Sequence, residues 1–324
     1  MLFLRASLLK LACAVIVCAA TGCANSTGVP QLASPHATTQ SVNNFHSHIG
    51  WLSSQARAGK GLVYLSDNNG NAVYIFKKDA LSQGPIGEIT SGVSAPNGLA
   101  VDSAGNLYVA NSNNTITFYR HGKTTPSRTY SNGISLPFGI VVSARTGRLY
   151  VANLDSNSVT EYPKGSTDPD TTISFQSLEG NDPYAVALDD SDNLFVSALG
   201  YPTARAYEVP YGTQTPEDLG ISGIKVMHGI AVDAKGNITI VDQGDNVIDI
   251  FPPGSDTPKK KITQGLIQPI LIALDHRQRR LYVADAGTGT NGGLWLYSYP
   301  GGKLLMQVHL SGLTVPEGVA VSPI

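Results

Sequence analysis

One phrase recurs along this chain and constrains its fold more than any other feature. Pro96–Asp102 reads Pro-Asn-Gly-Leu-Ala-Val-Asp, and after a short turn Leu107–Asn111 reads Leu-Tyr-Val-Ala-Asn. Related phrases start at Pro137, Pro183, Met227, Pro269 and Pro316. Their spacing is roughly 41 to 47 residues. A repeat of this length, filled with short strand-type segments and without a helical pattern, predicts an all-β propeller.

Each repeat contains four strand-type segments, as expected for one blade of a propeller. In the repeat that starts at Pro96, the expected strands are Gly98–Asp102, Asn106–Asn111, Thr115–Arg120 and Ser127–Ser131. The first strand of several repeats carries small residues, among them Gly98 and Gly229. Small side chains suit the innermost strand, because the sheets converge there and space is narrowest.

The two ends of the repeat region complement each other. Pro316–Val321 has the pattern of a first strand with nothing after it, whereas Leu62–Asp67 and Ala72–Phe76 read as later strands without a first strand. Joined, these pieces make a sixth blade and remove the free edges of an open array. We therefore predict a six-bladed β-propeller over residues 61–324, with four antiparallel strands in each blade, closed by the C-terminal strand.

The composition excludes one broad class of function. The chain has 324 residues, a formal net charge of -2 and only 14% charged side chains. Nucleic-acid binding driven by bulk positive charge is therefore not expected. We expect a monomeric globular domain that has no nucleic-acid partner.

The N-terminal segment resembles a bacterial lipoprotein signal. Basic residues precede an apolar run, Leu11–Ala20, that is too short for a comfortable membrane span. The run ends in Ala20-Thr21-Gly22-Cys23, which is similar to the lipobox, where a peptidase cuts before a cysteine that carries diacylglycerol. The resemblance implies a signal peptide over residues 1–22 and a lipid anchor on Cys23.

The cysteine pattern agrees with export. Cys13 and Cys18 lie inside the predicted signal peptide, and no cysteine follows Cys23. The mature chain would have no disulfide and no thiol nucleophile, which suits an oxidising compartment. Ala24 after the cysteine resembles lipoproteins that are sorted to an outer membrane. We therefore predict an extracytoplasmic protein, lipid-anchored to the bacterial cell envelope at the periplasmic face of the outer membrane or at the cell surface.

The segment after the cysteine predicts a tether. From Ala24 to about Asn44 the chain is rich in Ser, Thr, Asn, Gln, Pro and Ala, with too little apolar surface to repay the entropy of ordering. We expect residues 23–60 to be flexible, apart from a short helix or plug at Ile49–Arg57 against one end of the propeller.

Several phrases resemble a known repeat family. Gly229–Asp233, Gly236-Asn237 and Leu281–Asp285 look like NHL repeats, and the body from about Gly61 to Ile324 is similar to six-bladed NHL or gluconolactonase-like propellers. The resemblance implies the fold rather than one activity, because such propellers include lactonases, lyases, sugar and peptide binders and sensor domains.

Two sets of side chains should gather at one mouth of the axial channel, where the loop before each first strand meets the loop after each second strand. We call the first set the mouth residues; each comes directly after the repeated proline or, in one repeat, after Met227. They are Asn97, Phe138, Tyr184, His228, Ile270 and Glu317. The strand-end residues, which close each second strand, are Asp67, Asn111, Asn153, Ala198, Asp242 and Asp285. Together they mix carboxylates, amides, two aromatic rings and one imidazole.

A binding module is the function that needs the fewest assumptions. Phe138 and Tyr184 on neighbouring blades would stack on a sugar ring or a peptide side chain, and polar neighbours would supply hydrogen bonds. The predicted ligand-binding residues are Asn97, Phe138, Tyr184, His228, Asn111, Asn153 and Asp242. We expect a binding or interaction module for a small molecule, a glycan or an envelope protein. Asn and Asp at strand ends belong to the repeat itself, so a role in holding loops stays open.

The family resemblance also implies an enzymatic alternative. Gluconolactonase-like enzymes hold a divalent cation with Glu, Asn and Asp side chains at the mouth, and Glu317 and Asn97 resemble part of that set. Asp67 and Asp285 would complete a Ca²⁺ or Mg²⁺ site, and His228 is the candidate catalytic base. Tyr184 and His228 stand at the two positions where the family has an amide and a carboxylate. A metal-dependent lactonase or an NHL-type lyase is therefore the second prediction, behind the binding module.

Overall fold

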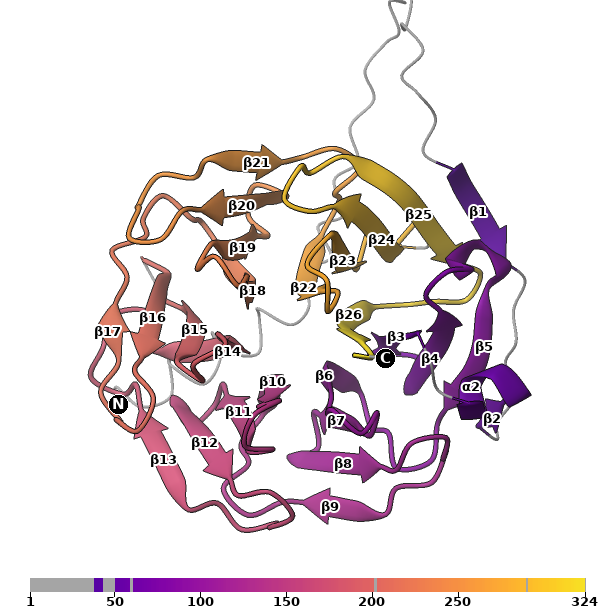
Figure 1. The fold of residues 1–324 in the computed structure, drawn as a ribbon, viewed down its shortest axis with the longest axis horizontal. Coiled ribbons are helices and arrows are strands. Elements are labelled where there is room, and N and C mark those ends of the chain that lie inside the picture. The colour runs from indigo at the N-terminus through magenta and orange to yellow at the C-terminus, as the bar shows by residue number, and fades with distance from the viewer. Residues whose placement is uncertain (1–37, 43–49, 59–60, 201–202, 290, 324) are drawn as a thin grey trace, which may run out of the picture. The chain divides into compact units, whose positions relative to one another are not determined.

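The computed structural model describes residues 38–42, 50–58, 61–200, 203–289 and 291–323. Within these ranges the strands form six sheets, arranged as a ring around a central axis (Figure 1). The predicted all-β, six-bladed propeller is confirmed. The blades are numbered here in chain order, beginning with the blade that contains residues 62–67.

Blades 2 to 5 each consist of four consecutive strands, ordered from the axis outward. Blade 2 contains β6 (Pro96–Val101), β7 (Leu107–Asn111), β8 (Thr115–Tyr119) and β9 (Arg128–Tyr130). Blade 3 contains β10 (Pro137–Val142), β11 (Leu149–Asn153), β12 (Ser158–Tyr162) and β13 (Thr171–Ser174). Blade 4 contains β14 (Asp182–Leu188), β15 (Leu194–Leu199), β16 (Arg205–Val209) and β17 (Glu217–Asp218). Blade 5 contains β18 (Met227–Val232), β19 (Ile238–Asp242), β20 (Val247–Phe251) and β21 (Lys260–Ile262).

Blades 6 and 1 meet where the two ends of the ring join. Blade 6 contains β22 (Pro269–Leu274), β23 (Arg280–Asp285), β24 (Gly293–Ser298) and β25 (Leu304–Leu310). Blade 1 contains the C-terminal β26 (Pro316–Val321) as its inner strand, followed by β3 (Leu62–Asp67), β4 (Ala72–Lys77), the 3-10 helix η1 (Leu81–Gln83) and β5 (Pro85–Ile89). β26 pairs antiparallel with β3, and the Leu62 amide donates to Oγ of Ser322 at 3.1 Å. The predicted closure of the ring by the C-terminal strand is confirmed.

Three further elements lie in the segment that the sequence assigns to a tether. β1 (Thr38–Val42) pairs in parallel with β25 and adds a fifth strand to blade 6. β2 (Trp51–Leu52) pairs with β5, and α2 (Ser54–Ala58) follows it. The free N–H and C=O groups of an edge strand can pair with a further segment, and polar composition alone does not reveal such pairing. The described parts of residues 23–60 therefore belong to the rim of blades 6 and 1 rather than to a free tether.

The predicted signal peptide, the lipid anchor at Cys23 and the first part of the tether lie outside the described residues, and they stay predictions. Where the chain is described, no helix has the length and apolar character needed to cross a membrane. The helix α2, for example, has five residues.

The blades bury both faces of their inner strands and approach each other closely at the axis. β7, β11 and β19 are buried along their whole length, because the neighbouring sheets cover both sides. A β-carbon added at Gly229 would lie 2.9 Å from the carbonyl oxygen of Ile270 in the next blade, and one at Gly98 would collide with the carbonyl oxygen of Phe138. The expectation that small residues line the narrow centre is confirmed.

Candidate functional site

Every first strand of the ring breaks its pairing register at the mouth. In blade 2, Pro96 and Leu99 keep their partners on β7, and the two residues between them, Asn97 and Gly98, form a β-bulge. A bulge bends the strand and redirects a side chain. The same irregularity occurs in the other five first strands, at Phe138, Tyr184, His228, Ile270 and Glu317. The six mouth residues therefore share one backbone position.

The repeated phrase locates the mouth residues in the sequence, but these bulges were not predicted from it. The signal was the glycine that follows the mouth residue in four of the first strands: Gly98, Gly139, Gly229 and Gly318. Glycine inside a strand pattern often marks a bulge or a close approach of two backbones, and here it marks both.

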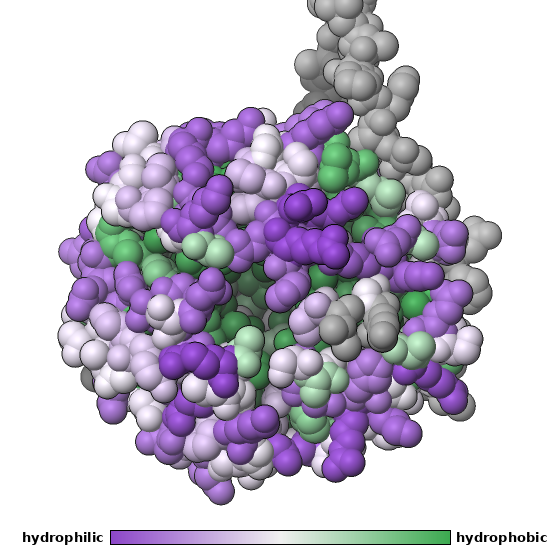
Figure 2. Space-filling model, viewed as in Figure 1, coloured by the Kyte–Doolittle hydropathy of each residue, from purple (hydrophilic) through white to green (hydrophobic). Residues whose placement is uncertain are grey.

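Three neighbouring mouth residues stack into an aromatic arc, formed by Phe138, Tyr184 and His228. The ring centroids of Phe138 and Tyr184 are 4.4 Å apart at an interplanar angle of 31°, and those of Tyr184 and His228 are 4.2 Å apart at 7°. All three side chains are buried. Figure 2 shows one face of the ring, which is hollowed at its centre. The aromatic arc is therefore a continuous stack of three rings that runs across the first strands of blades 3 to 5.

Two mouth residues carry a buried polar atom without a hydrogen-bond partner in the described part of the chain, namely Nδ1 of His228 and Oε2 of Glu317. Burial lowers the pKa of His228 to about 3, so the imidazole is neutral at pH 7. Burial, aided by the carboxylate of Asp67, raises the pKa of Glu317 to about 8, so that carboxyl is mostly protonated at pH 7. A general base works best with a pKa near the working pH, and His228 does not have one. The mouth thus offers two neutral hydrogen-bonding groups.

The side-chain oxygens of the strand-end residues accept hydrogen bonds from backbone amides. In five blades the side chain accepts hydrogen bonds from the loop that leads into the first strand of the same blade. These hydrogen bonds are 2.8 to 3.1 Å long. The donor amides and their acceptors are Ser94 to Asn111, Ser135 to Asn153, Val226 to Asp242, Gln268 to Asp285 and Val315 to Asp67. This geometry supports the loop-holding role that the sequence left open. Ligand binding by Asn111, Asn153 and Asp242 stays a prediction.

The residues predicted to hold a cation do not come together as a metal site. The oxygens of Asp67 and Asp285 already accept backbone amides of their own blades, and Oδ1 of Asn97 accepts from Nδ2 of Asn68 at 2.8 Å. Among the residues that the structure describes, no group of three or more His, Cys, Asp or Glu side chains could hold a metal ion. Ca²⁺ and Mg²⁺ need several oxygen ligands around one point. The predicted cation site at Glu317, Asn97, Asp67 and Asp285 therefore gains no support from these contacts and stays a prediction.

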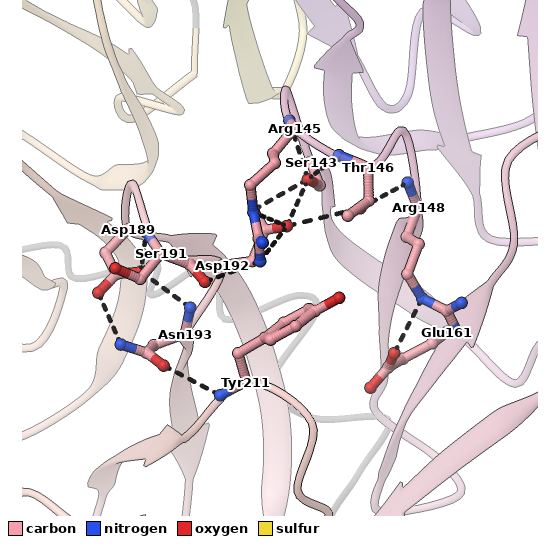
Figure 3. Close-up of polar contacts among 10 residues, drawn as sticks. All are labelled: Ser143, Arg145, Thr146, Arg148, Glu161, Asp189, Ser191, Asp192, Asn193 and Tyr211. Atoms are coloured by element: carbon pink, nitrogen blue, oxygen red, sulfur yellow. Dashed lines mark hydrogen bonds and ion pairs between the residues drawn. The ribbon is translucent and has the colours of Figure 1, made fainter.

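A second concave feature, which the sequence analysis missed, lies between blades 3 and 4. We name it the 3/4 groove; it has a volume of about 250 Å³, and Figure 3 shows the polar contacts around it. Its polar lining includes Arg148, Glu161, Asp170, Asp192 and Tyr211. Its apolar lining includes Tyr150, Ile173 and Leu194.

Arg148 joins two carboxylates on its own blade. Its Nε donates to Oε2 of Glu161 at 3.2 Å, and its Nη2 donates to Oδ1 of Asp170. The hydrogen bond from Arg148 lowers the pKa of Asp170, whereas burial raises the pKa of Glu161 despite the same guanidinium. One guanidinium therefore serves two carboxylates here.

Asp192 links blade 4 to blade 3. Oγ of Ser143 donates to Oδ2 of Asp192 at 2.8 Å, and Nε of Arg145 donates to the same oxygen at 3.2 Å. Asp192 has a φ of 63°, in the left-handed region where the corresponding turns of blades 2 and 5 have Gly105 and Gly236. This conformation costs a residue with a side chain about 1 kcal/mol, and the bonds between the blades offset that cost.

Tyr211 stands at the rim of the 3/4 groove and is 49% exposed. Its backbone amide donates to Oδ1 of Asn193 at 2.9 Å, and Nδ2 of Asn193 donates to Oδ2 of Asp189 at 2.9 Å. The guanidinium of Arg145 lies 4.3 Å from the centroid of the Tyr211 ring, a cation–π contact (Figure 3). An exposed aromatic ring is thus held in a defined place by its neighbours.

Departures from the repeat could have revealed this groove. In the hairpin turns of three blades, an Asn side chain donates to an Asp carboxylate four residues earlier: Asn106 to Asp102, Asn193 to Asp189 and Asn237 to Asp233. In blade 3, Ser143 stands where those turns have the Asp, and Arg148 stands where they have the Asn. The Ser leaves room for a carboxylate from the next blade, and the Arg reaches Glu161 instead of closing its own turn.

The fold and these sites define the chain as a six-bladed β-propeller with a mouth at its axis and a groove between two blades. No protein-family model and no curated protein matches its sequence. Among solved structures, a chain from the crystal structure of a nidogen/laminin complex is similar, with a TM-score of 0.68 and 14% sequence identity. The match covers 81% of this chain and 98% of that chain. At this identity the likeness shows the fold alone, and the resemblance to NHL and gluconolactonase-like proteins stays a prediction.

Proposed function

We propose that this chain is a binding module whose axial mouth recognises an uncharged polar ligand, such as a sugar or a segment of a partner protein. The observation that carries the proposal is the pair of buried, unpartnered polar atoms on His228 and Glu317, which share their backbone position with the aromatic arc. Buried polar groups nearly always have a hydrogen-bond partner, so these two atoms suit a ligand. Both groups are neutral at pH 7, which favours an uncharged ligand.

Two further points support recognition over catalysis. The similar solved structure is a complex of nidogen and laminin, so a propeller of this architecture occurs in a protein–protein assembly. The lactonase or lyase alternative would need several oxygen ligands around one cation, and among the described residues no group of three or more His, Cys, Asp or Glu side chains could hold one. Its candidate base, His228, has a pKa of about 3. We therefore do not propose an enzymatic activity.

The binding module is proposed to be tethered to the bacterial envelope through lipid on Cys23. The support is the apolar run followed by Ala20-Thr21-Gly22-Cys23. Expression in a bacterial host fed with an alkyne-labelled palmitate tests this: we expect the chain to be labelled and to sediment with membranes. Cys23→Ala should abolish the labelling and release the protein. Equal labelling of the parent and Cys23→Ala would refute the anchor.

The mouth is tested with the full chain carrying Cys23→Ser, so that it can be purified without lipid. Ligand-observed NMR with two sets of uncharged probes, methyl glycosides and blocked neutral dipeptides, should reveal binding by one set. Tyr184→Ala removes the central ring of the aromatic arc and should weaken that binding about tenfold.

Tyr211→Ala is the matched control, since it removes a tyrosine that lies outside the mouth. It should bind the probe as the parent does. A melting curve for each variant separates loss of binding from loss of fold. The proposal is wrong if neither set of probes binds, or if a folded Tyr184→Ala variant binds as tightly as the parent.

A further inference from the structure

The 3/4 groove has a structural counterpart between blades 1 and 2, which we name the 1/2 groove. Strand register sets the equivalence: Tyr150 pairs with Glu161 in blade 3 as Tyr64 pairs with Ile75 in blade 1. The residues that the following blades contribute to the two grooves also correspond. Asp192 of the 3/4 groove matches Gly105 of the 1/2 groove, Leu194 matches Leu107, and Tyr211 matches His121. The two grooves are therefore the same feature of the repeat, lined by different residues.

The 1/2 groove is filled by the chain itself. Leu52 from β2 and Ala56 from α2 line it, and Ala56 is only 2% exposed. Both residues pack with the apolar residues of blades 1 and 2, and only about 10 Å³ of open volume remains. The carbonyl oxygen of Arg57 lies 3.0 Å from the place where a β-carbon at Gly122 would stand. A groove at this position of the repeat therefore accepts an extra segment of polypeptide.

The 3/4 groove differs from its filled counterpart in volume and in chemistry. It keeps about 250 Å³ of open volume. Where the filled groove has Ile75, Gly105 and His121, the open groove has Glu161, Asp192 and Tyr211. An apolar plug such as Leu52 and Ala56 would take water away from these carboxylates and offer them no hydrogen bond in return, so an occupant with polar groups suits this groove better.

The charges of the 3/4 groove favour a cation. Its lining holds three carboxylates, on Glu161, Asp170 and Asp192, and one guanidinium, on Arg148. Arg145 outside the lining pairs with Asp192, which still leaves one carboxylate in excess. An anionic ligand would be repelled by this excess, whereas a cation would be attracted.

The size of the 3/4 groove favours one side chain over a whole small molecule. Pockets that enclose a drug-sized ligand have volumes of roughly 300–1,000 Å³, and this groove is smaller. Tyr150, Ile173 and Leu194 offer apolar contact for an aliphatic stem. Tyr211 at the rim is 49% exposed and adds further ring surface beside the opening.

We propose that the 3/4 groove docks a short segment of a partner protein that inserts one arginine side chain between blades 3 and 4. The guanidinium pairs with Glu161 and Asp170, and the stem lies on the apolar lining. This site is distinct from the mouth, because Asp192 and Tyr211 lie on loops at the opposite ends of the strands from the mouth residues. The proposal therefore goes beyond the proposed function of the mouth.

The test uses the full chain with Cys23→Ser and two blocked peptides, acetyl-Gly-Arg-Gly-amide and the same peptide with citrulline in place of arginine. Citrulline has the shape of arginine without the charge. Backbone amide NMR should show shifts confined to the 3/4 groove with the arginine peptide at concentrations up to about 10 mM, as expected for a single weak contact. The citrulline peptide should bind about fivefold more weakly, the loss expected for one exposed ion pair.

Two matched variants complete the experiment. Asp170→Asn should weaken binding of the arginine peptide about fivefold. Asp256→Asn, on the corresponding outer loop of blade 5, makes the same change of net charge and should have no effect. Equal binding of the two peptides, shifts located elsewhere, or no shift at all would overturn the proposal. Shifts at the groove caused by N-acetylglucosamine and not by the arginine peptide would also overturn it, in favour of a glycan.

Discussion

The 1/2 groove and the 3/4 groove occupy the same position of the repeat, yet the chain fills the first with Leu52 and Ala56 and leaves the second open. The backbone around them is equivalent, since Tyr64 and Tyr150 pair with the next strand in the same register. The difference lies in the side chains: the filled groove has Ile75 and Gly105 where the open groove has the carboxylates of Glu161 and Asp192. Side-chain chemistry, rather than the fold, selects what a groove of this repeat accepts.

The largest loss of stability is expected from removing β26, the strand that completes blade 1 beside the filled 1/2 groove. Ending the chain before Pro316 removes β26, the inner strand of blade 1, and exposes the edges of both β3 and the neighbouring blades. We expect loss of cooperative folding of the entire ring. Circular dichroism during heating measures it. Unchanged melting of this truncated chain would show that blade 1, and with it the filled groove, is not needed for closure.

The next prediction concerns the bonds that join Asp192 of the open groove to the neighbouring blade. Asp192→Ala removes the acceptor for Ser143 and Arg145 but keeps a side chain at a positive φ, so it should destabilise the protein by about 2–3 kcal/mol. Asp192→Gly also loses the bonds but relieves the backbone, and should recover about 1 kcal/mol of that loss. Urea denaturation measures both variants. Equal stability of the two would mean that the backbone cost at this position is negligible.

A third prediction compares one residue from each groove. Leu52→Ala should destabilise the protein by about 2 kcal/mol, the lower end of the range for such truncations, because Leu52 is only partly buried. Tyr211→Ala should change stability by no more than about 0.5 kcal/mol, since the ring is largely exposed. Denaturant titrations under the same conditions compare them. A larger loss for Tyr211→Ala would mean that the open groove is part of the structural core.

The smallest effect is a pH dependence that only the open groove should show. Burial raises the pKa of Glu161, so this carboxylate gains a proton at a higher pH than an ordinary glutamate. The arginine peptide needs the ionised form, and its affinity should therefore fall a few-fold as the pH is lowered from about 7.5 to about 4.5, where a glutamate with a raised pKa is more than half protonated. Asp170 stays ionised over this range, because Arg148 lowers its pKa, so binding weakens without vanishing. Affinity that rises as the pH falls would contradict the proposed role of Glu161.

The repeat made most of the fold predictable from sequence. Leu62–Asp67 was assigned as a strand that lacks its first strand, and the structure gives it the same bounds and pairs it with β26. The pairing of β1 and β2 with outer strands was not predictable, because edge pairing depends on free backbone groups and leaves no mark in a short polar segment.

The candidate sites were predictable only in part. The repeat placed Phe138, Tyr184 and His228 at equivalent positions, and the structure stacks them. The open groove depends on contacts between different strands and loops, such as Arg148 with Asp170, whose distance in space the sequence does not give. Its one visible trace was the replacement of the usual turn residues by Ser143 and Arg148.

Exchanging the lining of one groove for that of the other tests most directly whether side chains select the occupant. The double variant Glu161→Ile with Tyr211→His gives the 3/4 groove two residues of the 1/2 groove. A blocked peptide with the sequence of residues 50–56 serves as the probe in amide NMR titrations. We predict that the variant binds this peptide at the 3/4 groove and no longer prefers the arginine peptide to its citrulline analogue, while the parent chain does the reverse. A variant that keeps the preference for arginine and ignores the 50–56 peptide would contradict the account.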